Sequence, residues 1–163
     1  MRLYFRQTSR TLDRAFGKGL TRGRVEYHVL NEEKQILYSV RLDLNKFIIY
    51  DALGNNLATI QEKFGGSDCT ISGVNGIQGV FERMSLRANK GYIWASAGYV
   101  LNMLDAAHFD IYKNGCYVMR INSEATVTFI SDNCNYWLDV YNPECMFDGV
   151  IITMAKALLS YDK

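Results

Sequence analysis

Basic side chains near the start of the chain are the residues whose type and spacing could do chemistry. They recur at every fourth position, as Arg2, Arg6, Arg10, Arg14, Lys18 and Arg22. This spacing places them on one side of either a strand or a helix, and clustered cations attract phosphate groups and anionic surfaces. We therefore expect them to bind an anionic ligand or a phospholipid head group. The competing interpretation is a solvated face that pairs in part with acidic residues elsewhere in the chain.

The charge balance of the chain limits its partners. The formal net charge is +1 at pH 7, and Asp13 is the single acid between Arg2 and Arg24, so the remainder of the chain is correspondingly acidic. A near-neutral chain with few aromatic residues among these cations is atypical of a protein that binds nucleic acid. The partners that we expect are an anionic lipid surface or another protein. The sequence predicts no oligomeric state.

A metal site has little support in the sequence. His108 and Asp110 lie two positions apart, with Asp105 nearby. In a strand His108 and Asp110 would share a face and could bind a metal ion, but a lone His-x-Asp has little specificity, and we expect a polar surface pair. The cysteines show no C-x-x-C spacing, so we expect them to be reduced thiols packed in a cytosolic protein: Cys69, Cys116, Cys134 and Cys145.

Catalytic motifs are missing as well. The glycines between Gly65 and Gly79 form neither the G-x-G-x-x-G pattern nor a phosphate-binding loop, and the chain contains no G-x-S-x-G. We find no nucleophile paired with a base. The sequence therefore predicts a protein that is not an enzyme and has no cofactor; an enzyme would need an open polar cavity inside the fold.

Strands are the elements that must position these residues. Alternating apolar residues between Ile36 and Leu44 predict a half-buried strand. Apolar runs at 46–50 and 57–62 flank a turn at 51–56, and Asn114-Gly115 predicts a hairpin between 109–112 and 116–121. The remaining predicted strands cover residues 3–7, 25–30, 68–72, 80–84, 92–95, 99–104, 126–131 and 136–141.

The pattern changes to a helix at Pro143. Asn142 is expected to cap it and Pro143 to be its first residue. Apolar residues cover most of the circumference from 144 to 160, and only a narrow strip is different: Gly149, Thr153, Lys156 and Ser160. Such a helix must be largely surrounded by protein, and its length of about 25 Å suits a small barrel better than a bilayer. About eleven strands around it would leave two sheet edges, which closure into a barrel removes.

Several segments resemble the LURP-one-related family. Residues 43–63, DLNKFIIYDALGNNLATIQEK, resemble its repeated hairpin. Residues 2–7 look like its first strand, and residues 136–140 with the apolar helix look like its last strand and central helix. The resemblance implies one domain over 1–163 with a fold similar to the tubby C-terminal domain and to phospholipid scramblases. That fold is a mainly β, roughly twelve-stranded closed antiparallel barrel around a C-terminal hydrophobic helix, with strands to about 141 and the helix at about 143–160.

The family also shapes the expected function. Its tubby relatives imply binding of phosphoinositide head groups, but residues 8–23 and 65–79 depart from the pattern and no lipid-contacting residue can be carried over. We expect a non-enzymatic binding module that binds its ligand through the basic N-terminal segment. The alternative is a protein-interaction or scaffold domain that uses a strand edge or a loop. We expect a cytoplasmic location, at the inner membrane face if the ligand is a lipid.

Overall fold

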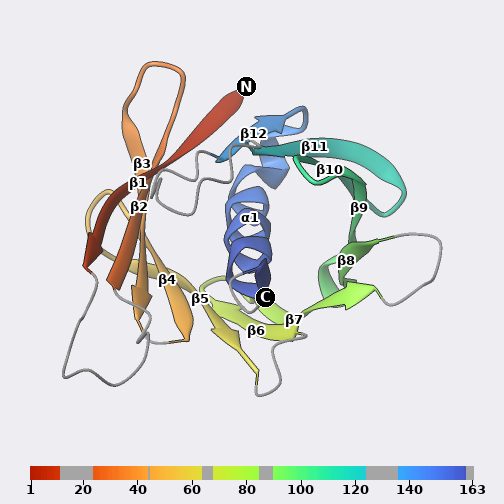
Figure 1. Cartoon of the computed structure of the whole chain (residues 1–163), viewed down its shortest axis with the longest axis horizontal. Helices are drawn as coiled ribbons and strands as arrows, with labels where there is room; N and C mark the ends of the chain where they lie inside the picture. Colours follow the sequence, from red (N-terminus) through yellow and green to blue (C-terminus); the bar gives the residue numbers. More distant parts are fainter. Residues whose placement is uncertain (12–23, 44, 64–67, 85–89, 124–135, 161–163) are drawn as a thin grey trace.

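A ring of strands surrounds one helix in the computed structural model, which describes residues 1–11, 24–43, 45–63, 68–84, 90–123 and 136–160 (Figure 1). Each strand pairs with its neighbours in chain order, and all the pairs are antiparallel. The strands are β1 (Arg2–Thr11), β2 (Arg24–Leu30), β3 (Ile36–Asp43), β4 (Lys46–Asp51), β5 (Asn56–Glu62), β6 (Asp68–Gly73), β7 (Gln78–Met84), β8 (Gly91–Trp94), β9 (Tyr99–Asp105), β10 (His108–Lys113), β11 (Cys116–Ser123) and β12 (Tyr136–Val140).

The barrel closes where the first strand meets the last. Strand β1 pairs with β2 on one side and with β12 on the other, and Leu3 lies opposite Leu138 with both side chains fully buried. This pairing leaves no unpaired sheet edge among the described strands. The predicted fold class, a mainly β closed antiparallel barrel of twelve strands with a C-terminal helix, is confirmed.

The hairpin turns follow the predicted chemistry. Asn114 and Gly115 have φ angles of 49° and 85°, as the two-residue turn between β10 and β11 requires. In the β4–β5 turn the Asp51 carboxylate accepts hydrogen bonds from the backbone N–H groups of Leu53 and Asn55, each at 2.9 Å. The strand predicted over 126–131 lies outside the described residues.

The apolar alternation of β3 is confirmed only in its second half. Val40 and Leu42 are buried, but Ile36 is 46% exposed. Ile36 directly follows the turn that joins β2 to β3, where its side chain is not covered by the core. Leu44 lies outside the described residues, so the last position of the predicted stripe is not described.

The C-terminal helix begins with the predicted cap. The Asn142 side chain accepts a hydrogen bond from the backbone N–H of Glu144 at 3.1 Å, and Pro143 follows the cap. The first turn is a 3₁₀ helix, η3 (Pro143–Cys145), so the α-helix α1 (Met146–Ser160) starts later than predicted. No helix in the described part of the chain is long and apolar enough to cross a membrane.

The helix α1 is buried at Gly149, Thr153 and Lys156 of its predicted polar strip as well as on its apolar faces, and the side chain of Ser160 lies outside the described part. Thr153 is 1% exposed and its hydroxyl donates to the Gly149 carbonyl at 2.7 Å, which satisfies it within the helix. Lys156 is 6% exposed and its ammonium group lies over two aromatic rings of the barrel. A Cβ on Gly149 would meet Met119 and Leu138 of the barrel wall, so glycine allows the helix and wall to approach closely. The helix therefore lies inside the strands, as its sequence predicts (Figure 1).

Candidate functional site

Strand β1 places the first two basic residues on the outside of the barrel. Leu3 and Phe5 point inward and are buried. Arg2, Tyr4 and Arg6 occupy the alternate positions and are exposed. The structure thus brings Arg2 and Arg6 to one face of β1, as their spacing predicts.

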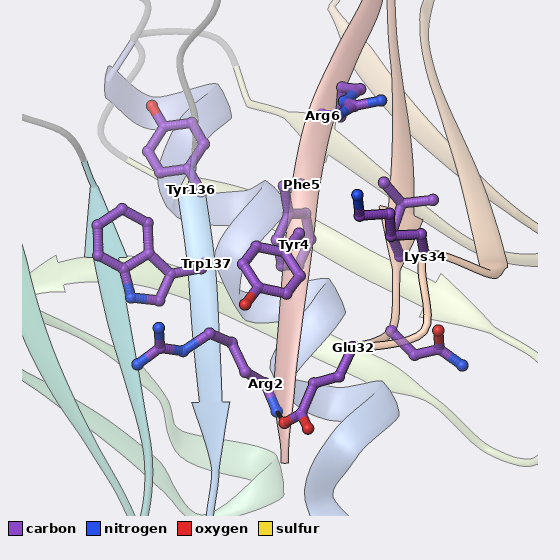
Figure 2. A pocket seen from close by; sticks show the side chains of 10 residues that line it. Arg2, Tyr4, Phe5, Arg6, Glu32, Lys34, Tyr136 and Trp137 are labelled. Carbon is purple, nitrogen blue, oxygen red and sulfur yellow. Dashed lines mark hydrogen bonds between the residues drawn. The ribbon is translucent and has the colours of Figure 1, made fainter.

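A pocket of about 500 Å³ lies over this face, between the start of β12 and the turn that joins β2 to β3 (Figure 2). Its charged and polar walls come from Arg2, Arg6, Asn31, Glu32 and Lys34. Its aromatic and apolar walls come from Tyr4, Phe5, Leu30, Tyr136 and Trp137. Small-molecule sites in proteins commonly have volumes of about 300–1,000 Å³, so the pocket is large enough for a small ligand.

Arg2 is held in place by several partners. Its Nε donates to Asp139 Oδ1 at 2.7 Å, and this hydrogen bond raises the pKa of the guanidinium. Its guanidinium carbon lies 5.9 Å from the centroid of the Trp137 ring, and its backbone N–H donates to Glu32 Oε1 at 2.7 Å. The Asp139 carboxylate compensates part of the Arg2 charge. Arg2 is therefore a fixed side chain that orients the floor of the pocket, and not a cation that is free to bind an anion.

Arg6 and Lys34 are the cations of the pocket that have no acidic partner among the described residues. Both side chains are exposed. Lys34 sits in the β2–β3 turn at a φ angle of 63°, and its backbone N–H donates to the Asn31 carbonyl at 3.0 Å. Among the described residues that line the pocket, Glu32 is the one acid against the three cations Arg2, Arg6 and Lys34, so this part of the lining is net positive.

The rest of the predicted basic series is not part of the described pocket. Arg10 belongs to β1, but its side chain lies outside the described part, as do the whole residues Arg14, Lys18 and Arg22. The β1–β2 pairing shifts register between Gln7 and Ser9. A bulge interrupts the alternation of a strand, so a spacing of four residues gives no guide to the face beyond Arg6.

Of the lining residues that the sequence did not predict, Tyr4, Lys34 and Trp137 matter most for the site. Tyr4 and Trp137 are cross-strand partners on β1 and β12; closure of the predicted barrel joins these strands, but the sequence does not predict the register that pairs the two residues. Lys34 follows Asn31 in a turn segment of the chain. Its charge was visible in the sequence, but its position beside Arg6 depends on how the β2–β3 hairpin folds over β1.

The other candidate residues form two pairs, one at the surface and one with a buried carboxylate. The Nδ1 atom of His108 lies 2.8 Å from Asp105 Oδ1 at the surface, so the polar surface pair that was expected between His108 and Asp110 is wrong. Asp110 instead accepts a hydrogen bond from Arg120 Nε at 2.7 Å. The pKa of Asp105 is lowered, first by the backbone N–H of Ala107 and then by His108.

The cysteines follow the prediction only in part. Cys69 and Cys145 are buried free thiols. Cys116 is exposed, so the expectation that it packs in the core is wrong. It is the first residue of β11, directly after the Asn114-Gly115 turn, where the core does not reach it. Cys134 lies outside the described residues.

We compared the chain with models of protein families, with curated proteins and with solved structures, and none of the three comparisons found a match. The resemblance of residues 43–63 to the LURP-one-related hairpin therefore stays a prediction. The function has to be argued from the geometry of the pocket.

Proposed function

We propose that this barrel is a non-enzymatic binding module, similar to LURP-one-related and tubby-like proteins, that binds a phosphate-bearing anion in the pocket beside β1. Arg6 and Lys34 contact the anion directly, and Arg2 orients the floor. The observation that carries the proposal is that Arg6 and Lys34, from separate elements, line one pocket without an acidic partner in the described part of the chain.

Phosphate suits this arrangement better than a carboxylate does. A phosphate group has several charged oxygens and can bridge two cations that approach from different sides, whereas a carboxylate is smaller and flat. The Arg6 guanidinium can bind two phosphate oxygens at once, and the Lys34 ammonium adds a compact charge. Both side chains are exposed, so the anion can enter without displacing the core.

The phosphate could belong to a soluble molecule or to a phospholipid head group, and two experiments separate these sources. Isothermal titration calorimetry measures binding of pyrophosphate and inositol trisphosphate. Co-sedimentation measures binding to phosphatidylcholine vesicles with and without a phosphatidylinositol bisphosphate. Binding in calorimetry alone indicates a soluble ligand, and binding to the phosphoinositide vesicles indicates a lipid. A lack of binding in both experiments overturns the proposal.

A double charge reversal tests the assigned residues. Arg6→Glu with Lys34→Glu is expected to weaken anion binding by about tenfold or more, since each cation near an anionic surface contributes on the order of 1 kcal/mol. The matched control is Lys46→Glu with Lys90→Glu, which makes the same change in net charge outside the pocket. Equal loss in both double variants would show that overall charge, and not the pocket, attracts the anion.

The alternative function is a protein-interaction domain, and one surface that it was expected to use is an exposed strand edge. Every described strand is paired on both sides, so the described part of the barrel offers no strand edge to another protein. A partner protein would have to bind loops or outward side chains. The pocket beside β1 is therefore the better-supported site.

A further inference from the structure

Two aromatic side chains form one wall of the pocket. Tyr4 on β1 and Trp137 on β12 are directly opposite each other in the strand register, and both line the cavity (Figure 2). Tyr4 is 41% exposed and Trp137 is half-buried. Their rings make no aromatic contact with each other among the ring pairs of the described residues. Among the described residues, Arg2 lies over the Trp137 ring but no aromatic ring stacks on either side chain, so the wall still offers aromatic surface to a ligand.

The two cations without an acidic partner in the described part of the chain, Arg6 and Lys34, also line the pocket. Figure 2 shows Trp137 on the β12 side, Lys34 on the β2–β3 turn, and Tyr4 and Arg6 on β1 between them. Arg2 lies near the indole of Trp137, with its guanidinium carbon 5.9 Å from the ring centroid, and so helps to fix that ring. Within the pocket, Trp137 and Arg2 thus lie toward β12, and Lys34 lies toward the β2–β3 turn.

The pocket is larger than a small anion, so an anion alone does not fill it. The cavity holds about 500 Å³, and a phosphate group between Arg6 and Lys34 occupies a small part of that volume. Ligand sites are typically filled by apolar or aromatic contact, with a few charged groups that fix the orientation. The lining also contains Tyr4 and Trp137, whose flat faces favour a flat partner.

We infer that the ligand carries a planar aromatic ring beside its phosphate, as a nucleotide or another aryl phosphate does. The ring packs against Tyr4 and Trp137, and the phosphate lies between Arg6 and Lys34. This inference rests on the proposed anion site and adds the class of ligand that enters it.

Calorimetry with a series of probes tests the inference. Pyrophosphate provides the anion alone, inositol trisphosphate adds a ring that is not planar, and adenosine diphosphate adds a planar ring. We expect adenosine diphosphate to bind about tenfold more tightly than pyrophosphate, which corresponds to about 1.4 kcal/mol, and more tightly than inositol trisphosphate.

Variants of Tyr4 and Trp137 test whether these two rings cause the higher affinity for adenosine diphosphate. Trp137→Leu and Tyr4→Leu are expected to remove the advantage of adenosine diphosphate and to leave the affinity for pyrophosphate within about twofold of the wild type. Trp137→Phe is expected to keep most of the advantage, because a flat ring remains. Tyr141→Leu is the matched control, since Tyr141 is 60% exposed but does not line the pocket.

The outcomes separate this inference from the function on which it rests. If pyrophosphate binds and adenosine diphosphate binds no more tightly, the aromatic ring is wrong and the anion site stands. If the advantage of adenosine diphosphate persists in Trp137→Leu and Tyr4→Leu, the inferred wall is wrong. If no probe binds in calorimetry, the inference is overturned, and the proposed function is overturned with it when the phosphoinositide vesicles do not bind either.

Discussion

The ammonium nitrogen of Lys156 lies 4.5 Å from the centroid of the Phe109 ring, inside the barrel. It also lies 5.5 Å from the centroid of the Tyr136 ring, and the side chain is only 6% exposed. A cation over the face of an aromatic ring is attracted by the negative charge of that face, and more strongly where water is excluded. Helix α1 thereby holds a charged residue in an interior that is otherwise largely apolar.

The charge at position 156 is expected to matter for stability. Lys156→Glu places a negative charge against the ring faces and should lower the free energy of unfolding by about 3 kcal/mol or more, as burial of a mispaired charge does. Lys156→Met keeps the length of the side chain without the charge and should cost less. Urea unfolding measures both values. Equal losses in the two variants would show that the sign of the charge is unimportant.

Gly149 is expected to tolerate no larger side chain. Alanine is the better helix former by about 1 kcal/mol, but its Cβ would meet Met119 Sδ and lie 2.7 Å from Leu138 Cδ2. Overpacking of this kind typically costs about 1–3 kcal/mol, so Gly149→Ala should lower the free energy of unfolding. The cost should shrink in a Met119→Ala background, where space has been made. A cost that stays the same in both backgrounds would contradict this account.

The buried thiol of Cys69 is expected to make the folded protein less stable at alkaline pH. Burial raises its pKa from 9.0 to about 12, so the folded state keeps the proton that the unfolded state releases above about pH 9. The contribution of this raised pKa to the free energy of unfolding is fully present below pH 9. It falls by about 1.4 kcal/mol per pH unit as the pH rises toward 12. Urea unfolding at several pH values should therefore give a steeper decline for the wild type than for Cys69→Ala. Parallel declines would refute the assignment.

Removal of the carboxylate that pairs with Arg2 is expected to strengthen anion binding. Asp139→Asn removes the carboxylate that Arg2 binds at 2.7 Å, so the guanidinium can turn toward the pocket with its charge uncompensated. An exposed ion pair is worth up to about 1 kcal/mol, so the affinity for pyrophosphate should rise about two- to fivefold in calorimetry. Asp110→Asn is the control, since its partner Arg120 does not line the pocket. An unchanged or lower affinity in Asp139→Asn would contradict the claim that Asp139 compensates the charge that Arg2 could offer to an anion.

The architecture could be predicted from the sequence because it depends on local patterns. The alternation in β3, the Asn114-Gly115 turn and the cap at Asn142 each act over a few residues. An apolar helix that follows them can be buried only within the strands. The depth of that burial was underestimated: Thr153 was assigned to a polar strip, yet it is buried because the backbone of its own helix satisfies its hydroxyl.

The candidate site could be predicted only in part because it depends on long-range register. The spacing of Arg2 and Arg6 was enough to place them on one face of a strand. The aromatic wall needs Tyr4 to pair with Trp137, residues from opposite ends of the barrel sheet. Lys34 joins them only because the β2–β3 turn lies beside β1. Sequence patterns within one strand or turn predict neither the pairing of Tyr4 with Trp137 nor the position of Lys34 beside β1.

Fluorine NMR of the protein labelled with fluorotryptophan tests the central claim most directly. The chain has two tryptophans: Trp137 lines the pocket, whereas Trp94 is 2% exposed in the core and donates to the Gln78 carbonyl. Addition of pyrophosphate should shift the Trp137 resonance in a saturable manner and leave that of Trp94 unchanged. The Trp137 shift should disappear in the Arg6→Glu, Lys34→Glu double variant. An unshifted Trp137 resonance, or an equal shift of Trp94, would contradict an anion site beside β1.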